Sequence, residues 1–120
     1  GTLVKLHTTL PILFSSGSAR ISKEYKPFLA RLADFLGPYD VKIIVDGYAD
    51  PDPITTKIYP TNFELGAARA ANVVHTLVEN GLAPSIFEIS TPGRYRFQAK
   101  GISRQKSLER RAEITVLFTG

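Results

Sequence analysis

The 120-residue sequence contains no cysteine, methionine or tryptophan, and only two histidines, His7 and His75. Without cysteine, the chain has neither a disulfide framework nor a thiolate metal site. No apolar run approaches the ~18 residues that suggest a membrane-spanning helix. The sequence shows no signal peptide and begins with Gly1. We therefore expect any targeting segment or membrane anchor of the protein to lie outside this sequence.

The length and composition are those of one ordinary globular domain. Apolar residues make up 43% of the chain and charged residues 22%, a balance typical of soluble domains. A chain of this length has room for one hydrophobic core and not for two. We predict a single domain over residues 1–120, of which residues 1–9 can be an N-terminal extension or linker.

The net charge of +4 is unevenly distributed. Between Arg94 and Arg111 seven basic residues face one acidic residue, so this segment carries +6 and the remainder −2. The segment can be a solvated surface, or it can contact nucleic acid or another anionic polymer. Tyr95 and Phe97 are its only aromatic residues. Because base stacking needs interleaved aromatic rings, we predict no nucleic-acid partner.

Hydrophobic periodicity and turn residues predict an alternating series of strands and helices. In chain order these are one or two strand pieces within residues 2–14 interrupted by Pro11, a helix through residues 25–36, a strand at 41–46, a helix from 61 to about 80, a strand at 87–91, a short helix around 103–110 and a strand at 112–118. The order β-α-β-α-β-(α)-β predicts an α/β (α+β) sandwich with helices packed on one mixed sheet.

Local signals suggest where the two long helices begin and end. Ser22 is the candidate cap of the first helix, and Gly37-Pro38 ends it. Thr61 and Glu64 form a capping-box pattern for the second helix, and Gly81 is placed to end it. The predicted buried stripe of the first helix is Tyr25, Phe28, Leu29, Leu32, Phe35 and Leu36, and that of the second is Phe63, Ala67, Ala70, Val74, Leu77 and Val78.

Catalytic and metal-binding patterns find no support in the sequence. The serines at 15, 16 and 18 lack a Gly-x-Ser-x-Gly turn and a nearby base. Each histidine stands alone in a strand or helix pattern, which is typical of a structural role. Asp46, Asp50 and Asp52 lack the spacing of a calcium loop. We predict a protein that is not an enzyme and that has no metal and no cofactor.

A binding constellation remains. Asp50 directly follows a predicted buried strand, at the sheet edge where α/β folds present ligand-binding residues. Asn62 and Arg69 are seven residues apart on the second helix, so they project on one side, which we expect to border the core. A carboxylate and a guanidinium together suit a zwitterionic ligand. The alternative is a surface salt bridge between Asp50 and Arg69.

These residues lie in motifs that resemble the OmpA-like family, in order and over residues 10–118. The matching segments are Leu13-Phe14-Ser15-Ser16-Gly17-Ser18-Ala19, Gly47-Tyr48-Ala49-Asp50, Asn62-Phe63-Glu64-Leu65, Arg69-Ala70 and Arg110-Arg111-Ala112-Glu113-Ile114. Within the family, Pro60-Thr61-Asn62-Phe63-Glu64-Leu65 and the long loop before it most resemble the flagellar stator proteins MotB and PomB.

The resemblance implies a periplasmic domain that binds peptidoglycan without covalent chemistry. Asp50 and Arg69 match the family residues that hold the charged ends of diaminopimelate in the stem peptide, and Asn62 and Arg110 match positions lining that site. It further implies a homodimer belonging to an inner-membrane stator protein, with partner motor proteins contacted through segments outside this sequence. Outer-membrane or envelope anchoring of the Pal and OmpA type is the alternative, followed by a divergent member that binds another anionic polymer or a protein.

The sequence departs from the family pattern at four positions. Tyr48 replaces the usual histidine, Ala49 a threonine, Gly66 a serine and Glu109 an asparagine. Lost hydrogen bonds of about 1 kcal/mol each would weaken ligand binding or alter its specificity. We expect Asp50→Asn or Arg69→Ala to abolish peptidoglycan binding and to leave the fold intact.

Overall fold

The computed structural model describes residues 7–49, 59, 61–91 and 110–119. Its sheet contains β1 (His7–Leu13), β2 (Val41–Gly47), β3 (Phe87–Ser90) and β4 (Arg111–Phe118), in the order β1-β4-β2-β3. Strand β4 runs antiparallel to β1 and β2, whereas β3 runs parallel to β2. The predicted single mixed sheet is therefore confirmed. The helix expected around 103–110 lies outside the described residues.

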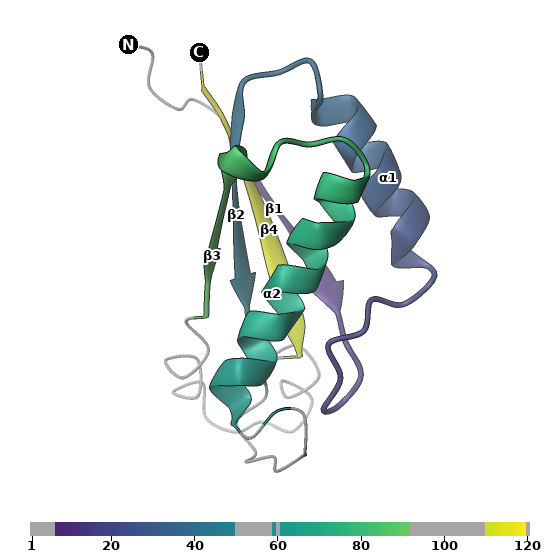
Figure 1. Cartoon of the computed structure of the whole chain (residues 1–120), viewed down its shortest axis with the longest axis vertical. Helices are drawn as coiled ribbons and strands as arrows, with labels where there is room; N and C mark the ends of the chain where they lie inside the picture. Colours follow the sequence, from purple (N-terminus) through teal and green to yellow (C-terminus); the bar gives the residue numbers. More distant parts are fainter. Residues whose placement is uncertain (1–6, 50–58, 60, 92–109, 120) are drawn as a thin grey trace.

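Two helices, α1 (Tyr25–Leu36) and α2 (Asn62–Glu79), cover one face of this sheet (Figure 1), and a short 3₁₀ helix, η1 (Pro84–Ile86), leads into β3. Alternate residues of β2 and β4 turn toward the helices, as the two-residue repeat of a strand requires. The core contains Val41, Ile43, Val45, Ala112, Ile114 and Val116 from these strands, with Leu29, Leu36, Ala70, Val73 and Leu77 from the helices.

Strand β1 continues through Pro11 instead of being interrupted by it. Pro11 stands opposite Glu113 of β4, and β1 is an edge strand with one hydrogen-bonded neighbour. Proline has no amide proton to donate, and an edge strand tolerates this because one of its sides has no partner strand.

Helix α1 ends before Gly37 as predicted, but its N-cap and one residue of its predicted buried stripe are wrong. The N-cap is Glu24 and not Ser22; the Ser22 hydroxyl instead donates to the Glu24 carboxylate at 2.7 Å. Phe35 is 59% exposed, and its ring lies 5.6 Å from that of Tyr39. The buried residues of α1 are Leu29, Ala33 and Leu36.

Helix α2 begins with the predicted capping box. The Glu64 amide donates to the Thr61 hydroxyl at 3.4 Å, and the Thr61 amide donates to the Glu64 carboxylate at 3.0 Å. The predicted buried stripe is partly wrong, since Phe63 is 64% exposed. The buried face contains Leu65, Gly66, Arg69, Ala70, Val73 and Leu77.

A close backbone crossing explains which face of α2 is buried. A Cβ atom on Gly47, the last residue of β2, would overlap the Gly66 carbonyl oxygen and lie 2.7 Å from the Gly66 carbonyl carbon. Only a pair of glycines permits this approach of a helix to a strand end. The contact turns the Gly66 side of α2, and with it Arg69, toward the sheet.

Candidate functional site

Strands β1 and β2 end, and α2 and β4 begin, at the same end of the sheet (Figure 1). Arg69 of α2 is the centre of a polar cluster with residues that follow β1 and β2. Its side chain is 0% exposed. The guanidinium donates to three backbone carbonyls: from Nε to Ser18 at 2.8 Å, from Nη1 to Tyr48 at 2.9 Å and from Nη2 to Ser15 at 3.0 Å. Its central carbon also lies 5.2 Å from the centre of the Phe14 ring.

These contacts make Arg69 a structural link as well as a candidate ligand residue. A buried cation is costly unless hydrogen bonds replace its hydration, and the three carbonyls do this. They join α2 to the loop after β1 and to the residue after β2. Arg69 therefore enters the core, whereas the sequence predicted that it would border it. Contrary to the expectation from the sequence, Arg69→Ala should therefore destabilise the fold.

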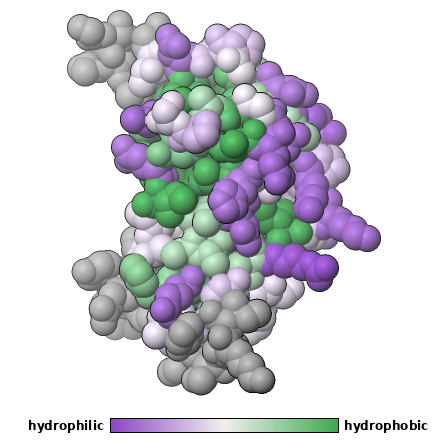
Figure 2. Space-filling view, in the orientation of Figure 1, coloured by the Kyte–Doolittle hydropathy of each residue, from purple (hydrophilic) through white to green (hydrophobic). Residues whose placement is uncertain are grey.

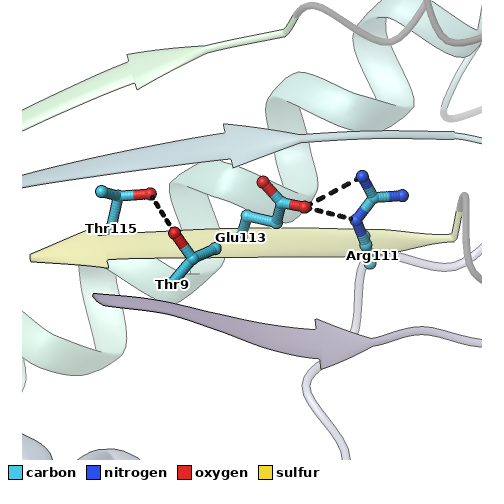
Figure 3. Close-up of polar contacts among 4 residues, drawn as sticks. All are labelled: Thr9, Arg111, Glu113 and Thr115. Atoms are coloured by element: carbon cyan, nitrogen blue, oxygen red, sulfur yellow. Dashed lines mark hydrogen bonds and ion pairs between the residues drawn. The ribbon is translucent and has the colours of Figure 1, made fainter. Parts of the chain in front are cut away.

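Tyr48, which replaces the family histidine, is held by Arg111 of β4. The Tyr48 side chain is 2% exposed, and the Arg111 guanidinium carbon lies 3.9 Å from the centre of its ring. The Tyr48 amide donates to the Arg111 carbonyl at 2.8 Å. Nε and Nη2 of Arg111 each lie 2.9 Å from Oε2 of Glu113 (Figure 3). This stacked, paired guanidinium fixes the backbone that leads into Asp50.

Sequence reasoning missed the roles of Arg111 and Glu113. The available signal was their two-residue spacing, which places both side chains on one face of a strand. That face is the one turned away from the helices, and the Thr9 and Thr115 hydroxyls meet on it at 3.3 Å (Figure 3). The partner of Arg111 across the sheet, Tyr48, could not be found without the strand register.

Two departures from the family pattern have a packing explanation. Ala49 is buried in a small cluster with Ala19 and Leu65, so its methyl group fills an apolar site. Gly66 stands at the close crossing with Gly47 described above. Of the two remaining departures, Tyr48 stacks with the Arg111 guanidinium, and Glu109 lies outside the described residues.

The remaining predicted site residues are placed as follows. Asn62 is the half-buried first residue of α2. Arg110 is half-buried just before β4, and its carbonyl accepts from the Phe14 amide at 2.7 Å. Phe14 thus contacts both Arg110 and Arg69. Asp50 lies outside the described residues, although it is bonded to the buried Ala49. The placement of Asp50 relative to Arg69 remains a prediction.

Among the residues that the structure describes, neither long helix has the hydrophobicity of a membrane span. Within the same residues, no three histidine or carboxylate side chains group in a way that could hold a metal ion.

Comparison with known proteins gives one family. The model of the OmpA family matches residues 13–115. The chain is 35% identical over 74 residues to the uncharacterized protein YtxE of Bacillus subtilis, covering 62% of this chain and 31% of that protein. It is 27% identical over 113 residues to Motility protein B of Helicobacter pylori, and the match covers 92% of this chain and 42% of that protein. The chain therefore spans less than half the length of these relatives.

Solved structures share the fold. The periplasmic domain of H. pylori MotB has a TM-score of 0.79 at 21% identity, covering 100% of this chain and 83% of that one. The cell wall anchor of the type VI secretion system (T6SS) from Pseudomonas aeruginosa has a TM-score of 0.74 at 29% identity. That match covers 95% of this chain and 82% of the other. The peptidoglycan-associated lipoprotein of Burkholderia pseudomallei has a TM-score of 0.75 at 21% identity, covering 88% of each chain. The family match over most of the sequence and the common fold show that this chain belongs to the OmpA family.

Proposed function

We propose that this domain binds the stem peptide of peptidoglycan non-covalently and so anchors a flagellar stator to the cell wall. The observation that carries the proposal is the OmpA-family match, and the bond from Arg69 to the Tyr48 carbonyl just after β2 supports the proposed position of the site. Relatives named as a cell wall anchor and as a peptidoglycan-associated lipoprotein support wall attachment. The domain works by binding, and no catalytic step is assigned to it.

The proposed recognition uses two opposite charges. The Asp50 carboxylate accepts the ammonium group of diaminopimelate, and the Arg69 guanidinium attracts its carboxylate. Asn62 and Arg110 flank these two groups. Because Arg69 is fully buried here, direct contact with a ligand carboxylate requires its surroundings to rearrange. Its bond to the Tyr48 carbonyl also fixes the backbone two residues before Asp50.

The MotB relatives support a cellular setting for this proposal. We place the domain in the periplasm, as the homodimeric wall-binding part of an inner-membrane protein that works in the stator with partner motor proteins. The H. pylori MotB similarity supports this setting. Light scattering on purified protein checks the dimer. Deletion of the gene should stop swimming while flagella still assemble.

Co-sedimentation with purified cell-wall sacculi tests the binding itself. Wild-type protein should pellet with sacculi, and Asp50→Asn should stay in the supernatant, because an amide does not balance an ammonium charge. Asp52→Asn is the matched control, since it removes the same charge from the same segment and should pellet like the wild type. Pelleting of all three proteins alike would remove Asp50 from the site.

Attachment of a different envelope machine is the second candidate function. The secretion-system wall anchor is 29% identical to this chain, against 21% for the MotB structure that covers all of it. The two candidates share the wall-binding site and differ in the machine that is anchored. Normal swimming of a deletion strain would favour the second candidate.

A further inference from the structure

A second polar site lies on the flank of α2 that faces the start of α1. A cleft of about 890 Å³ opens between the segment at residues 15–26 and this flank. Its lining consists of Ser15, Ser18, Arg20, Ile21, Ser22, Lys23, Lys26, Asn72, His75, Thr76 and Glu79. The α2 members are spaced by three and four residues, so they form one helix face. Hydrophilic side chains gather over the start of α1 on this side of the molecule (Figure 2).

The lining has an excess of positive charge. Arg20, Lys23 and Lys26 stand against one carboxylate, Glu79, which gives +2 with His75 neutral. All three cations are exposed. Within the described parts of the chain, none of the three forms an ion pair. The Glu24 carboxylate belongs to the same segment and accepts from the Ser22 hydroxyl, which leaves the three cations without a described ion-pair partner and available to an anion.

The walls of the cleft are held in place by hydrogen bonds. The Asn72 side-chain amide donates to the Ala19 carbonyl at 2.8 Å, and the Ser18 hydroxyl accepts from the Arg20 amide at 3.0 Å. The carbonyls of Ser15 and Ser18 are bound from the other side by Arg69. The loop that carries the cations is thus fastened to α2 at several points, which lowers the entropy lost when a ligand binds.

The chemistry of the lining selects the kind of anion. The cations supply donors for oxyanions. The Ser22 and Thr76 hydroxyls already donate to Glu24 and to the Asn72 carbonyl, so their oxygens remain as acceptors for hydroxyl groups of a ligand. The lining thus suits a ligand that has both oxyanions and hydroxyl groups. The lining has no phenylalanine, tyrosine or tryptophan; the His75 imidazole is its one ring and Ile21 its one aliphatic side chain. Successive nucleic-acid bases stack on several aromatic side chains, and a single imidazole does not provide such a platform for bases or for flat sugar faces. A slim, flexible chain without rings fits this lining.

We propose that this basic cleft binds a phosphodiester-linked polyol chain, with Arg20, Lys23 and Lys26 contacting successive phosphates. Among the described residues, the lining includes neither Asn62, Arg69 nor Arg110, although the Ser15 and Ser18 carbonyls also accept from Arg69. Binding in the cleft does not depend on the proposed recognition of the stem peptide. If both sites operate, the domain contacts two chemically different polymers.

Titration with short poly(glycerol phosphate), followed by calorimetry and by amide chemical shifts, tests the proposal. The double variant Arg20→Gln/Lys23→Gln should bind at least about tenfold more weakly, because two charge-assisted contacts are lost. The control Arg31→Gln/Lys42→Gln removes the same charge from exposed positions outside the cleft and should bind within about twofold of the wild type. Circular dichroism verifies that both variants are folded.

The outcomes separate a built site from general attraction. Shifts confined to residues 15–26 and to the Asn72–Glu79 face, with loss only in the cleft variant, support the proposal. Equal weakening in both double variants, or shifts elsewhere, would show attraction by net charge alone and overturn it. Equal binding of polygalacturonate or of a single-stranded DNA oligonucleotide would overturn the assignment to a phosphodiester polyol. Unchanged sacculus binding by the cleft variant shows that the two sites are independent.

Discussion

Replacement of Arg69 by alanine should destabilise the domain strongly. The change removes the donors bound to the carbonyls of Ser15, Ser18 and Tyr48 and the contact with Phe14. A buried polar group left without a partner costs about 1–3 kcal/mol. Removal of the buried charge recovers part of this, because the guanidinium no longer has to be desolvated. We expect a net loss of about 3–5 kcal/mol, against a total stability of about 5–15 kcal/mol for a typical domain.

Urea unfolding monitored by circular dichroism measures this loss. Arg69→Lys should lie between the alanine variant and the wild type, because an ammonium keeps the charge but lacks the planar fork that reaches all three carbonyls. Arg31 provides the control: it is exposed on α1, and Arg31→Ala should change the stability by no more than about 0.5 kcal/mol. If Arg69→Ala unfolds within about 1 kcal/mol of the wild type, the three bonds do not have the structural role assigned to them.

Three further predictions concern the frame around the site. Gly47→Ala should lower the free energy of unfolding by at least about 3 kcal/mol, because the new Cβ would overlap a carbonyl of α2. Gly37→Ala is the control, since a Cβ at Gly37 meets nothing nearer than 3.6 Å. Thermal melts should show this control to be neutral or slightly stabilising. Thr61→Ala removes the helix cap and should cost about 1 kcal/mol in urea unfolding; no change would contradict the capping role. The Tyr48 amide donates to the backbone carbonyl of Arg111, and the Arg111 guanidinium stacks on the Tyr48 ring. Arg111→Gln removes the stacked group and should therefore speed hydrogen exchange at the Tyr48 amide. Unchanged protection would contradict the role of the stacked guanidinium.

The sheet and both helices were predictable because their signals are local. The capping box at Thr61 and Glu64 formed as predicted, since its partners are three residues apart. The β-branched run of β2 likewise identified a buried strand. Such features need no knowledge of which elements meet in space.

The buried face of α2 could not be predicted with the same accuracy. Hydrophobicity favoured Phe63, but the face is set by the contact between Gly47 and Gly66, two residues far apart in sequence and without side chains. Once that contact turns the helix, Phe63 is exposed and Arg69 is buried. Tertiary packing overrides a periodicity that counts only apolar side chains.

The site residues remain a prediction from the sequence, and the structure adds geometry that the sequence did not indicate. Arg69 lies near the end of β2, where it binds the Tyr48 carbonyl. Its three carbonyl partners were not foreseen, because a backbone acceptor carries no sequence signature. The stacking of Arg111 on Tyr48 depends on the register between β4 and β2, which a single sequence does not specify.

Binding of soluble stem peptides tests most directly whether the domain recognises a wall-derived zwitterion. A peptide that ends in diaminopimelate has both an ammonium and a carboxylate on its terminal side chain, whereas the lysine analogue has only the ammonium. Calorimetric titration should show the diaminopimelate peptide binding at least about tenfold more tightly, which corresponds to one lost charge-assisted contact. Equal affinities for the two peptides would contradict the paired roles of Asp50 and Arg69.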